Sequence, residues 1–247
     1  MLDLKGLSKH FGGVIATRNV TLNVPRGEVH ALIGPNGAGK TTLIGQVAGT
    51  IRSDSGQVLF EGADITALAP HERVRRGLAR SFQITSIFGR LSVLDNLALA
   101  VQARSGSSFS FWKPVAAERD LFRQAEEIAA DIGLSGKLHF TSSALAHGEQ
   151  RALEVGLALA TQPRLVLLDE PMAGLGAEES RRMVELIERV SGRVTVLLVE
   201  HDMDAVFRLA DRISVLVNGR IVASGAPQEI RANEEVRKAY LGDELAA

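Results

Sequence analysis

A glycine-rich segment that ends in a lysine and two threonines is the part of the sequence whose residue types and spacing most directly predict chemistry. It follows the apolar stretch 29–33 and reads Gly34, Pro35, Asn36, Gly37, Ala38, Gly39, Lys40, Thr41 and Thr42. Its glycines allow successive backbone N–H groups to face one anion at the start of the next helix. Lys40 could then reach the β- and γ-phosphates of a nucleotide, and the Thr41 hydroxyl could coordinate Mg²⁺. We interpret the segment as a phosphate-binding loop, because a turn that merely caps a helix does not need a lysine and two hydroxyls.

A pair of carboxylates follows another apolar run. Asp169 and Glu170 come directly after 165–168, which we expect to be a buried parallel strand. The carboxyl ends of such strands are where open α/β sheets bind ligands. Asp169 could hold Mg²⁺, usually through water, beside Thr41, and Glu170 could orient or deprotonate a water that attacks the γ-phosphate. A helix cap or a solvated loop is the alternative, and the phosphate-binding loop upstream favours catalysis.

Two further polar residues stand at the ends of predicted elements. His201 follows the apolar run 194–199. A lone histidine is more often a surface or core residue than a catalytic one, but this one ends a strand beside that of Asp169, so it could reach the γ-phosphate. Gln83 lies where the α/β pattern gives way to a helical one. Its amide could bind the metal or the attacking water and report their presence to the helical region.

Composition limits the class of protein. The chain has 247 residues, 45% of them hydrophobic, which is enough for a sizeable core. A net charge of −1 gives no reason to expect a nucleic-acid partner, and zero cysteines exclude disulfides and thiolate metal sites. No apolar run reaches the roughly 20 residues needed to cross a bilayer, and the N-terminus lacks the apolar core of a signal peptide. We therefore expect a soluble chain that reaches a membrane only through a partner.

The elements needed to position these residues can be read from periodicity. Strands are expected up to about residue 33, followed by a helix from Lys40 to about Ala48. A helical pattern then runs from 85 to about 160. Two apolar runs separated by a helix over about 178–190 predict a parallel sheet with a right-handed crossover. Asn218-Gly219 predicts a tight hairpin near the end of the chain.

A small basic cluster needs its own interpretation. Arg73, Arg75, Arg76 and Arg80 lie close together in sequence. We expect them to form a solvated helix face, with a docking or anion contact as the alternative.

Together these residues resemble the ATP-binding cassette family, and the resemblance covers essentially the whole chain. The family's signature sequence is matched by Leu145, Ala146, His147, Gly148 and Glu149, which precede the helical run 152–160. Phe11 matches the position of the aromatic residue that stacks on adenine. The glutamine loop, magnesium carboxylate, catalytic glutamate and histidine switch of the family are matched by Gln83, Asp169, Glu170 and His201.

The resemblance implies a fold and a mechanism. The fold would be an α/β NTPase core with a parallel sheet and helices on both faces, an N-terminal antiparallel β subdomain and an inserted helical subdomain. Its single domain would comprise the core at 1–84 and 162–225, the helical subdomain at 85–161 and a helical tail at 226–247. Two cassettes would pair head to tail, with each ATP and its Mg²⁺ between one phosphate-binding loop and the opposite signature helix. Hydrolysis would open the dimer, and the helical subdomains would pass that motion to partner subunits.

Two positions depart from the family pattern. Ala146 replaces the usual serine, so one hydroxyl that would bond the γ-phosphate is missing. Gly176 stands where many members carry an aspartate that contacts the opposite subunit. We expect the first change to weaken one contact, and the second puts coupling through that loop in question.

Local sequences narrow the resemblance to one class of transporter. The segments 80–83, 106–114, 200–203 and 239–242 resemble the longer ATPase subunit of branched-chain amino-acid importers. That class implies transmembrane permease subunits, a second cassette that is identical or a shorter paralogue, and indirectly a periplasmic binding protein, with the chain peripheral on the cytoplasmic face of the membrane. Importers of urea or amides and exporters of lipopolysaccharide remain alternatives. So does a soluble cassette of translation or DNA repair, although the chain lacks a tandem cassette and a coiled-coil insertion. A phosphate-loop kinase or GTPase would not explain 145–151, and a structural nucleotide binder would not explain Glu170 and His201.

Overall fold

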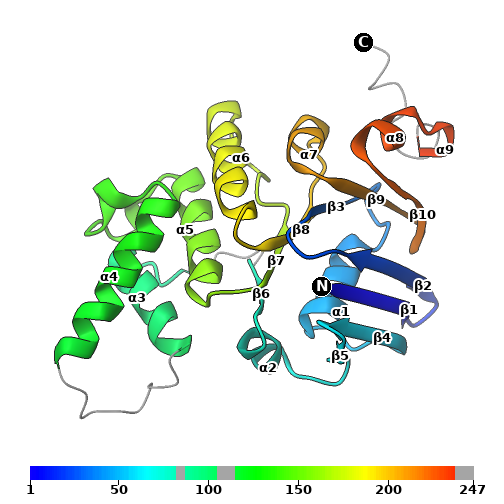
Figure 1. Cartoon of the computed structure of the whole chain (residues 1–247). Helices are drawn as coiled ribbons and strands as arrows, with labels where there is room; N and C mark the ends of the chain where they lie inside the picture. Colours follow the sequence, from blue (N-terminus) through cyan, green and yellow to red (C-terminus); the bar gives the residue numbers. More distant parts are fainter. Residues whose placement is uncertain (82–86, 105–114, 237–247) are drawn as a thin grey trace.

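Two β-sheets lie side by side in the computed structural model, with helices packed around them (Figure 1). The structure describes residues 1–81, 87–104 and 115–236. No helix in these ranges is long and apolar enough to cross a membrane.

The larger sheet has six strands in the order β10-β9-β3-β8-β7-β6. Its members are β3 (Val29–Ile33), β6 (Leu78–Arg80), β7 (Leu165–Asp169), β8 (Thr195–Val199), β9 (Arg212–Val217) and β10 (Arg220–Gly225). All neighbours are parallel except β9 and β10, which form the predicted hairpin. Asn218 (φ 48°) and Gly219 (φ 75°) both adopt the left-handed conformation that its two-residue turn requires. The parallel sheet predicted from the apolar runs is therefore confirmed.

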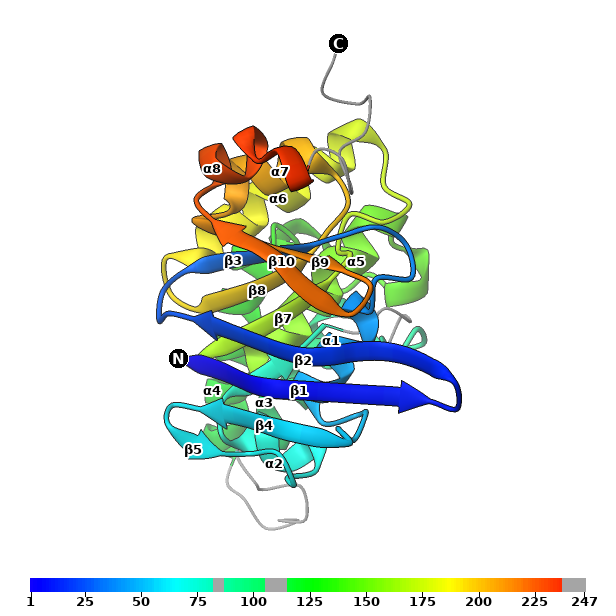
Figure 2. The ribbon, with the colours of Figure 1, turned by 90° about the vertical axis from the view of Figure 1, so that its right-hand side faces the viewer.

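The smaller sheet is antiparallel and has the order β2-β1-β4-β5. Figure 2 looks onto it, with strands β1 (Leu2–Phe11), β2 (Val14–Val24), β4 (Ser55–Phe60) and β5 (Ala63–Asp64). Helix α1 (Lys40–Ala48) packs with both sheets, since its Leu43 and Ile44 share one buried cluster with Leu4 of β1 and Leu167 of β7. The first helix after β3 is thus held on two sides.

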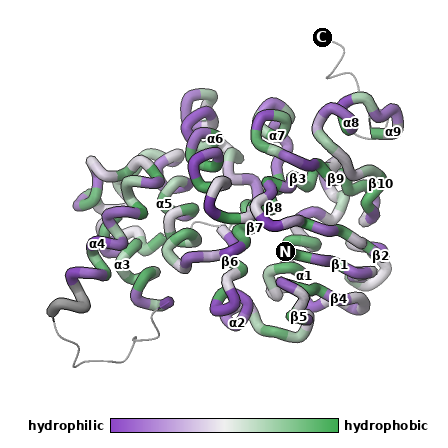
Figure 3. Tube along the Cα trace, viewed as in Figure 1, coloured by the Kyte–Doolittle hydropathy of each residue, from purple (hydrophilic) through white to green (hydrophobic). Residues whose placement is uncertain are grey.

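Helices cover the parallel sheet on both faces. The remaining helices are α2 (Pro70–Arg75), α3 (Val93–Arg104), α4 (Val115–Asp131), α5 (His147–Ala160), α6 (Ala177–Ser191), α7 (Met203–Leu209), α8 (Pro227–Ala232) and α9 (Glu234–Val236), with 3₁₀ turns at Ser135–Lys137 and Ser142–Ala144. Val166 and Leu168 of β7 pack toward α3 to α6, whereas their neighbours Leu165 and Leu167 join the cluster around α1. The surface-facing residues of α6 are hydrophilic, while its apolar residues recur along one side (Figure 3). This alternation explains why the core strands read as continuous apolar runs.

One buried polar side chain joins the segments that lead into helices α3 and α5. Asn96 is buried, accepts a hydrogen bond from Phe88 N (2.8 Å) and donates to Ser142 Oγ (2.9 Å). Before it, Asp95 N donates to Ser92 Oγ (3.0 Å), which caps α3. These contacts tie the segment before α3 to the segment before α5, so both helices start from one polar junction.

The basic cluster does not form a solvated helix face. Arg73 is 2% exposed and donates to the carbonyl oxygens of Gln46 (2.8 Å), Val47 (2.7 Å) and Thr66 (2.8 Å). It therefore satisfies the C-terminal carbonyls of α1, which have no partner within the helix. Arg80 is part of the site described below. The expectation of a solvated helix face was wrong for Arg73 and Arg80, because the four residues belong to α2, the turn after it and β6. Arg75 and Arg76 are exposed, as expected.

We expect R73A to lower the free energy of unfolding by about 3 kcal/mol, because several buried carbonyl groups lose a charged donor at once. Urea unfolding followed by circular dichroism measures this change. R75A, on the exposed side of the same helix, is the control and should change stability by less than about 0.5 kcal/mol. Equal effects of the two substitutions would contradict the capping role of Arg73.

Candidate nucleotide-binding site

The segment predicted to be a phosphate-binding loop, 34–42, joins β3 to the first turn of α1. The ammonium group of Lys40 turns back and donates to the carbonyl oxygens of Gly34 (2.6 Å) and Pro35 (3.1 Å), so the loop curls around the lysine side chain. Gly39 begins the helix with φ 105°, and no side chain caps it. The first N–H groups of α1 are thus left to an anion at the helix start.

Two glycines allow the loop to lie directly against neighbouring backbone. A Cβ atom at Gly34 would stand 2.0 Å from the carbonyl oxygen of Leu216, and one at Gly39 would stand 2.1 Å from that of Ala16. Both have positive φ angles, 155° and 105°. No other residue type fits at these two positions, so the curl of the loop is built into its packing.

The two predicted carboxylates lie at the end of β7, with Asp169 as its last residue and Glu170 directly after it. Asp169 is 1% exposed; its Oδ2 accepts a hydrogen bond from Arg80 Nη2 (2.8 Å), and its Oδ1 has no partner in the described structure. Glu170 has φ 50°, an unusual conformation for a residue other than glycine, and its N–H donates to Val199 O (2.8 Å). Such strain is concentrated at functional sites, and here it sets the direction in which the chain leaves the strand.

The lysine and the carboxylates face the same space. Burial lowers the pKa of Lys40, while the negative charges of Glu170 and Asp169 act in the opposite direction and raise it. The second effect requires the two carboxylates to lie near the ammonium group. Because β8 lies between β3 and β7, the carboxyl ends of all these strands meet at one edge of the sheet. The fold therefore brings Lys40, Asp169 and Glu170 to one edge of the sheet.

A buried glutamate that we did not assign holds the loops after β7 and β8. Glu200 is fully buried, and its carboxylate accepts hydrogen bonds from Met172 N (2.8 Å) and His201 N (3.0 Å). Burial raises its pKa, and the two backbone donors partly offset this effect. In the sequence, Glu200 could have been recognised as an ionisable residue directly after an apolar strand. His201 lies next to it with an exposed imidazole, whose Nδ1 is 3.7 Å from a Glu200 oxygen.

The signature segment starts α5, and its backbone donors are bonded to carboxylates. Ala146 N donates to Glu149 Oε2 (3.1 Å), and Gly148 N donates to Glu179 Oε1 (3.2 Å) of α6. A Cβ at Gly148 would stand 2.9 Å from that glutamate oxygen. Leu145 is buried and His147 is exposed. Within the described part of the chain, no hydrogen bond joins this segment to the phosphate-binding loop.

Of the two remaining predicted site residues, Phe11 and Gln83, only Phe11 lies within the described structure. Phe11 ends β1 with half of its surface exposed, and the Lys9 ammonium lies 5.4 Å from the ring centroid. The ring is thus free to stack on a flat ligand. Gln83 lies outside the described residues.

The donor set fits a magnesium ion bound together with phosphates. The buried, unpartnered Oδ1 of Asp169 is a free oxygen ligand, and the Thr41 side chain is exposed at the start of α1. In the described ranges, no group of three or more histidine, aspartate or glutamate residues could form a metal site alone. Mg²⁺ typically uses one or two protein ligands and takes its remaining oxygens from phosphates and water, so the residues present suit it.

Comparisons with known proteins agree with this geometry. The family model described as ABC transporter matches residues 17–173, and a model described as branched-chain amino acid ATP-binding cassette transporter matches 220–246. Curated relatives include the high-affinity branched-chain amino acid transport ATP-binding proteins BraF of Pseudomonas aeruginosa and LivG of Escherichia coli. Each is 36% identical, and the match covers 98% of both chains. The lipopolysaccharide export ATP-binding protein LptB of Acidithiobacillus ferridurans is 34% identical over 99% of this chain and 98% of its own.

Solved structures give the same result for the fold. A nucleotide-free ATP-binding cassette from an ABC transporter has a TM-score of 0.85 with 28% identity, and covers 98% of this chain and 99% of its own. A cassette in its ADP conformation has the same TM-score with 29% identity and covers 98% of both chains. The predicted fold class is confirmed. The chain belongs to the ABC transporter family, as one of its ATP-hydrolysing subunits with similarity to LivG and BraF.

Proposed function

We propose that the chain powers the import of branched-chain amino acids as one half of a head-to-tail ATPase dimer. The observation that carries the ATPase part is the meeting of Lys40, the free Asp169 oxygen and Glu170 at one edge of the sheet. The similarity of the whole chain to BraF and LivG, and the match at residues 220–246, support the choice of solute.

In this proposal the phosphate-binding loop holds the nucleotide. Lys40 and the N–H groups at the start of α1 bind the phosphates, and Phe11 stacks on the adenine. Thr41, Asp169 and Gln83 are the residues that would hold Mg²⁺, which neutralises charge on the phosphates when bound. The remaining members of the loop shape its backbone and are Gly34, Pro35, Asn36, Gly37, Ala38, Gly39 and Thr42.

Glu170 orients the water that attacks the γ-phosphate. Its backbone N–H is bonded to Val199 O and the buried Glu200 holds Met172 N, so its side chain starts from a fixed point where the chain leaves β7. His201 has an exposed side chain on a fixed backbone, so it can turn toward the γ-phosphate. Hydrolysis needs this positioning more than it needs covalent help from the protein.

The signature residues act on the nucleotide of the opposite subunit. We infer that the γ-phosphate there replaces Glu179 as the acceptor for Gly148 N, with Leu145, Ala146, His147 and Glu149 shaping the same helix start. The missing hydroxyl at Ala146 leaves recognition to backbone donors. Gly176 N bonds Glu179 Oε2 (3.2 Å), so this position supports the start of α6 without a side chain that could reach the partner.

The rest of the assembly follows from this dimer. We propose that the domain comprises the core at 1–84 and 162–225, the helical subdomain at 85–161 and the tail at 226–247, and that the helical subdomain transmits the motion of the dimer. The helical subdomain would contact transmembrane permease subunits at the cytoplasmic face of the membrane, and a periplasmic binding protein would deliver the solute. Lipopolysaccharide export is the second candidate, because the match to LptB covers the chain almost as well.

Uptake of labelled leucine by vesicles that contain this chain together with branched-chain amino-acid permease subunits, a second cassette and their binding protein tests the solute. We expect ATP-dependent uptake that K40A abolishes. ATP-driven release of lipopolysaccharide without leucine uptake would favour the second candidate and overturn the first.

E170Q should lower steady-state ATP hydrolysis by about 100-fold or more, because the amide cannot accept a proton from the attacking water. ATP binding should remain, and ATP should hold the dimer together, which size-exclusion chromatography with ATP measures. E178Q, on the exposed start of α6, serves as the control and should hydrolyse ATP at the wild-type rate. Undiminished turnover by E170Q would remove Glu170 from this role.

K40A should weaken ATP binding by about tenfold or more, equivalent to a loss of about 1.4 kcal/mol, because the buried cation that neutralises phosphate charge is gone. Isothermal titration calorimetry measures the affinity. K5A, an exposed lysine on β1, is the matched control. Equal affinities of K40A and wild type would contradict the phosphate-binding assignment.

A further inference from the structure

An arginine from the neighbouring strand contacts Asp169. Arg80 is the last residue of β6 and pairs in register with Leu167 of β7. Ser81 N extends this pairing by donating to Leu167 O (2.9 Å). The guanidinium therefore starts one strand away from Asp169, and Nη2 reaches its Oδ2 at 2.8 Å.

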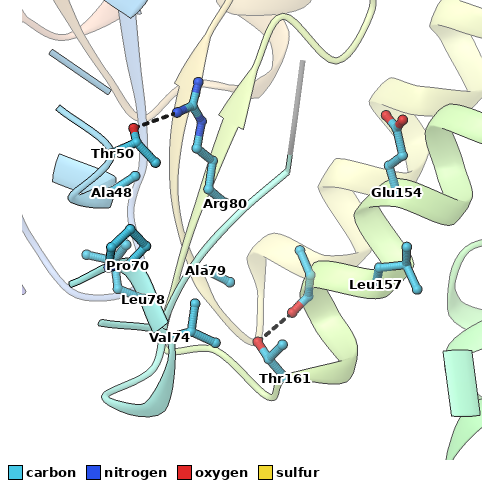
Figure 4. A pocket seen from close by; sticks show the side chains of 11 residues that line it. Ala48, Thr50, Pro70, Val74, Leu78, Ala79, Arg80, Glu154, Leu157 and Thr161 are labelled. Atoms are coloured by element: carbon cyan, nitrogen blue, oxygen red, sulfur yellow. Dashed lines mark hydrogen bonds between the residues drawn. The ribbon is translucent and has the colours of Figure 1, made fainter. Parts of the chain in front are cut away.

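The surroundings of Arg80 hold its side chain in one direction. Figure 4 shows it at the end of a groove whose walls come from α1, α2, β6 and α5. The groove is mainly apolar and is lined by residues such as Ala48, Pro70, Val74, Leu78 and Leu157. Arg80 Nη1 also donates to Thr50 Oγ1 (3.4 Å), just after α1 (Figure 4). The Arg80 side chain is only 14% exposed, so its guanidinium has little access to solvent and depends on Asp169 for charge compensation.

The two carboxylate oxygens of Asp169 have different surroundings. Oδ2 has a charged donor, whereas Oδ1 is buried without a partner among the described residues. An unpaired buried oxygen is costly, so it indicates a ligand. A carboxylate fixed through one oxygen and open at the other is the usual arrangement of a metal ligand with an outer hydrogen-bond partner.

We propose that Arg80 is a positioning residue that holds Asp169 so that Oδ1 faces the metal site. The inference rests on the proposed function, because it takes Asp169 as the magnesium carboxylate. It assigns Arg80 no contact with nucleotide or metal. The contact depends on the sheet, because the pairing of β6 with β7 sets the distance between the two side chains.

Binding of Mn²⁺ to the ADP complex, followed by electron paramagnetic resonance, tests the proposal. R80M should weaken Mn²⁺ binding about 10- to 100-fold, the range found for outer partners of metal ligands. Removing a positive charge near the metal would by itself tighten binding, so a loss reports positioning. Unchanged or tighter Mn²⁺ binding by R80M would overturn the proposal.

Controls separate this role from folding. ADP affinity in EDTA should be unchanged in R80M, because the phosphate-binding loop is intact. R193M, which breaks an exposed ion pair with Asp131, should bind Mn²⁺ like wild type. R80K keeps a charged donor and should recover part of the affinity. Should R80M fail to fold, R80A replaces it, and wild-type Mn²⁺ binding by R80A would overturn the proposal.

D169N separates the role of Asp169 as a metal ligand from the role of Arg80 as its positioning residue. Wild-type Mn²⁺ binding by D169N would remove Asp169 from the metal site and with it that part of the proposed function. Weak binding by D169N together with normal binding by R80M would overturn the role of Arg80 alone. If both are weak, adding R80M to D169N should cause little further loss, since the two side chains act as one unit.

Discussion

The parallel pairing of β3, β8 and β7 is the constraint on which the site depends. Each of these strands is fully buried, so its register is fixed by apolar side chains on both faces. A slip of one residue would exchange the two buried clusters and move Asp169 away from Lys40. The chemistry at the strand ends is therefore as well defined as the hydrophobic core beneath it.

A buried polar group, and not only the hydrophobic core, positions the segments that follow the strands. A buried carboxylate is costly unless it is hydrogen-bonded, and Glu200 meets this condition with the backbone of Met172 and His201. Its two acceptor oxygens join the chain after β7 to the chain after β8. Glu170, the proposed catalytic glutamate, and His201 thus lie in segments held by the same buried carboxylate, although a helix and a strand separate them in sequence.

The sequence alone predicted those features whose cause is local. The loop at 34–42, the carboxylates after an apolar run and the Asn218-Gly219 turn each carry their geometry in adjacent residues, and the structure agrees on their placement. Arg73, Arg80 and Glu200 could not be assigned, because the partner of each lies on another element. Four neighbouring arginines look alike in sequence, and only the sheet order separates a helix cap from a partner of Asp169. The positive φ of Glu170 likewise follows from where β8 holds its N–H.

The bond from Gly148 N to Glu179 affects how firmly two subunits can stay closed. In the proposed dimer this donor exchanges one anion for another, so closure gains only the difference between two hydrogen bonds rather than a whole one. The intramolecular acceptor is always present and becomes available again when the phosphate leaves. Because the hydrogen bond lost on opening is replaced within the same subunit, the dimer opens at a lower cost in free energy. This suits an ATPase dimer that must open after each hydrolysis.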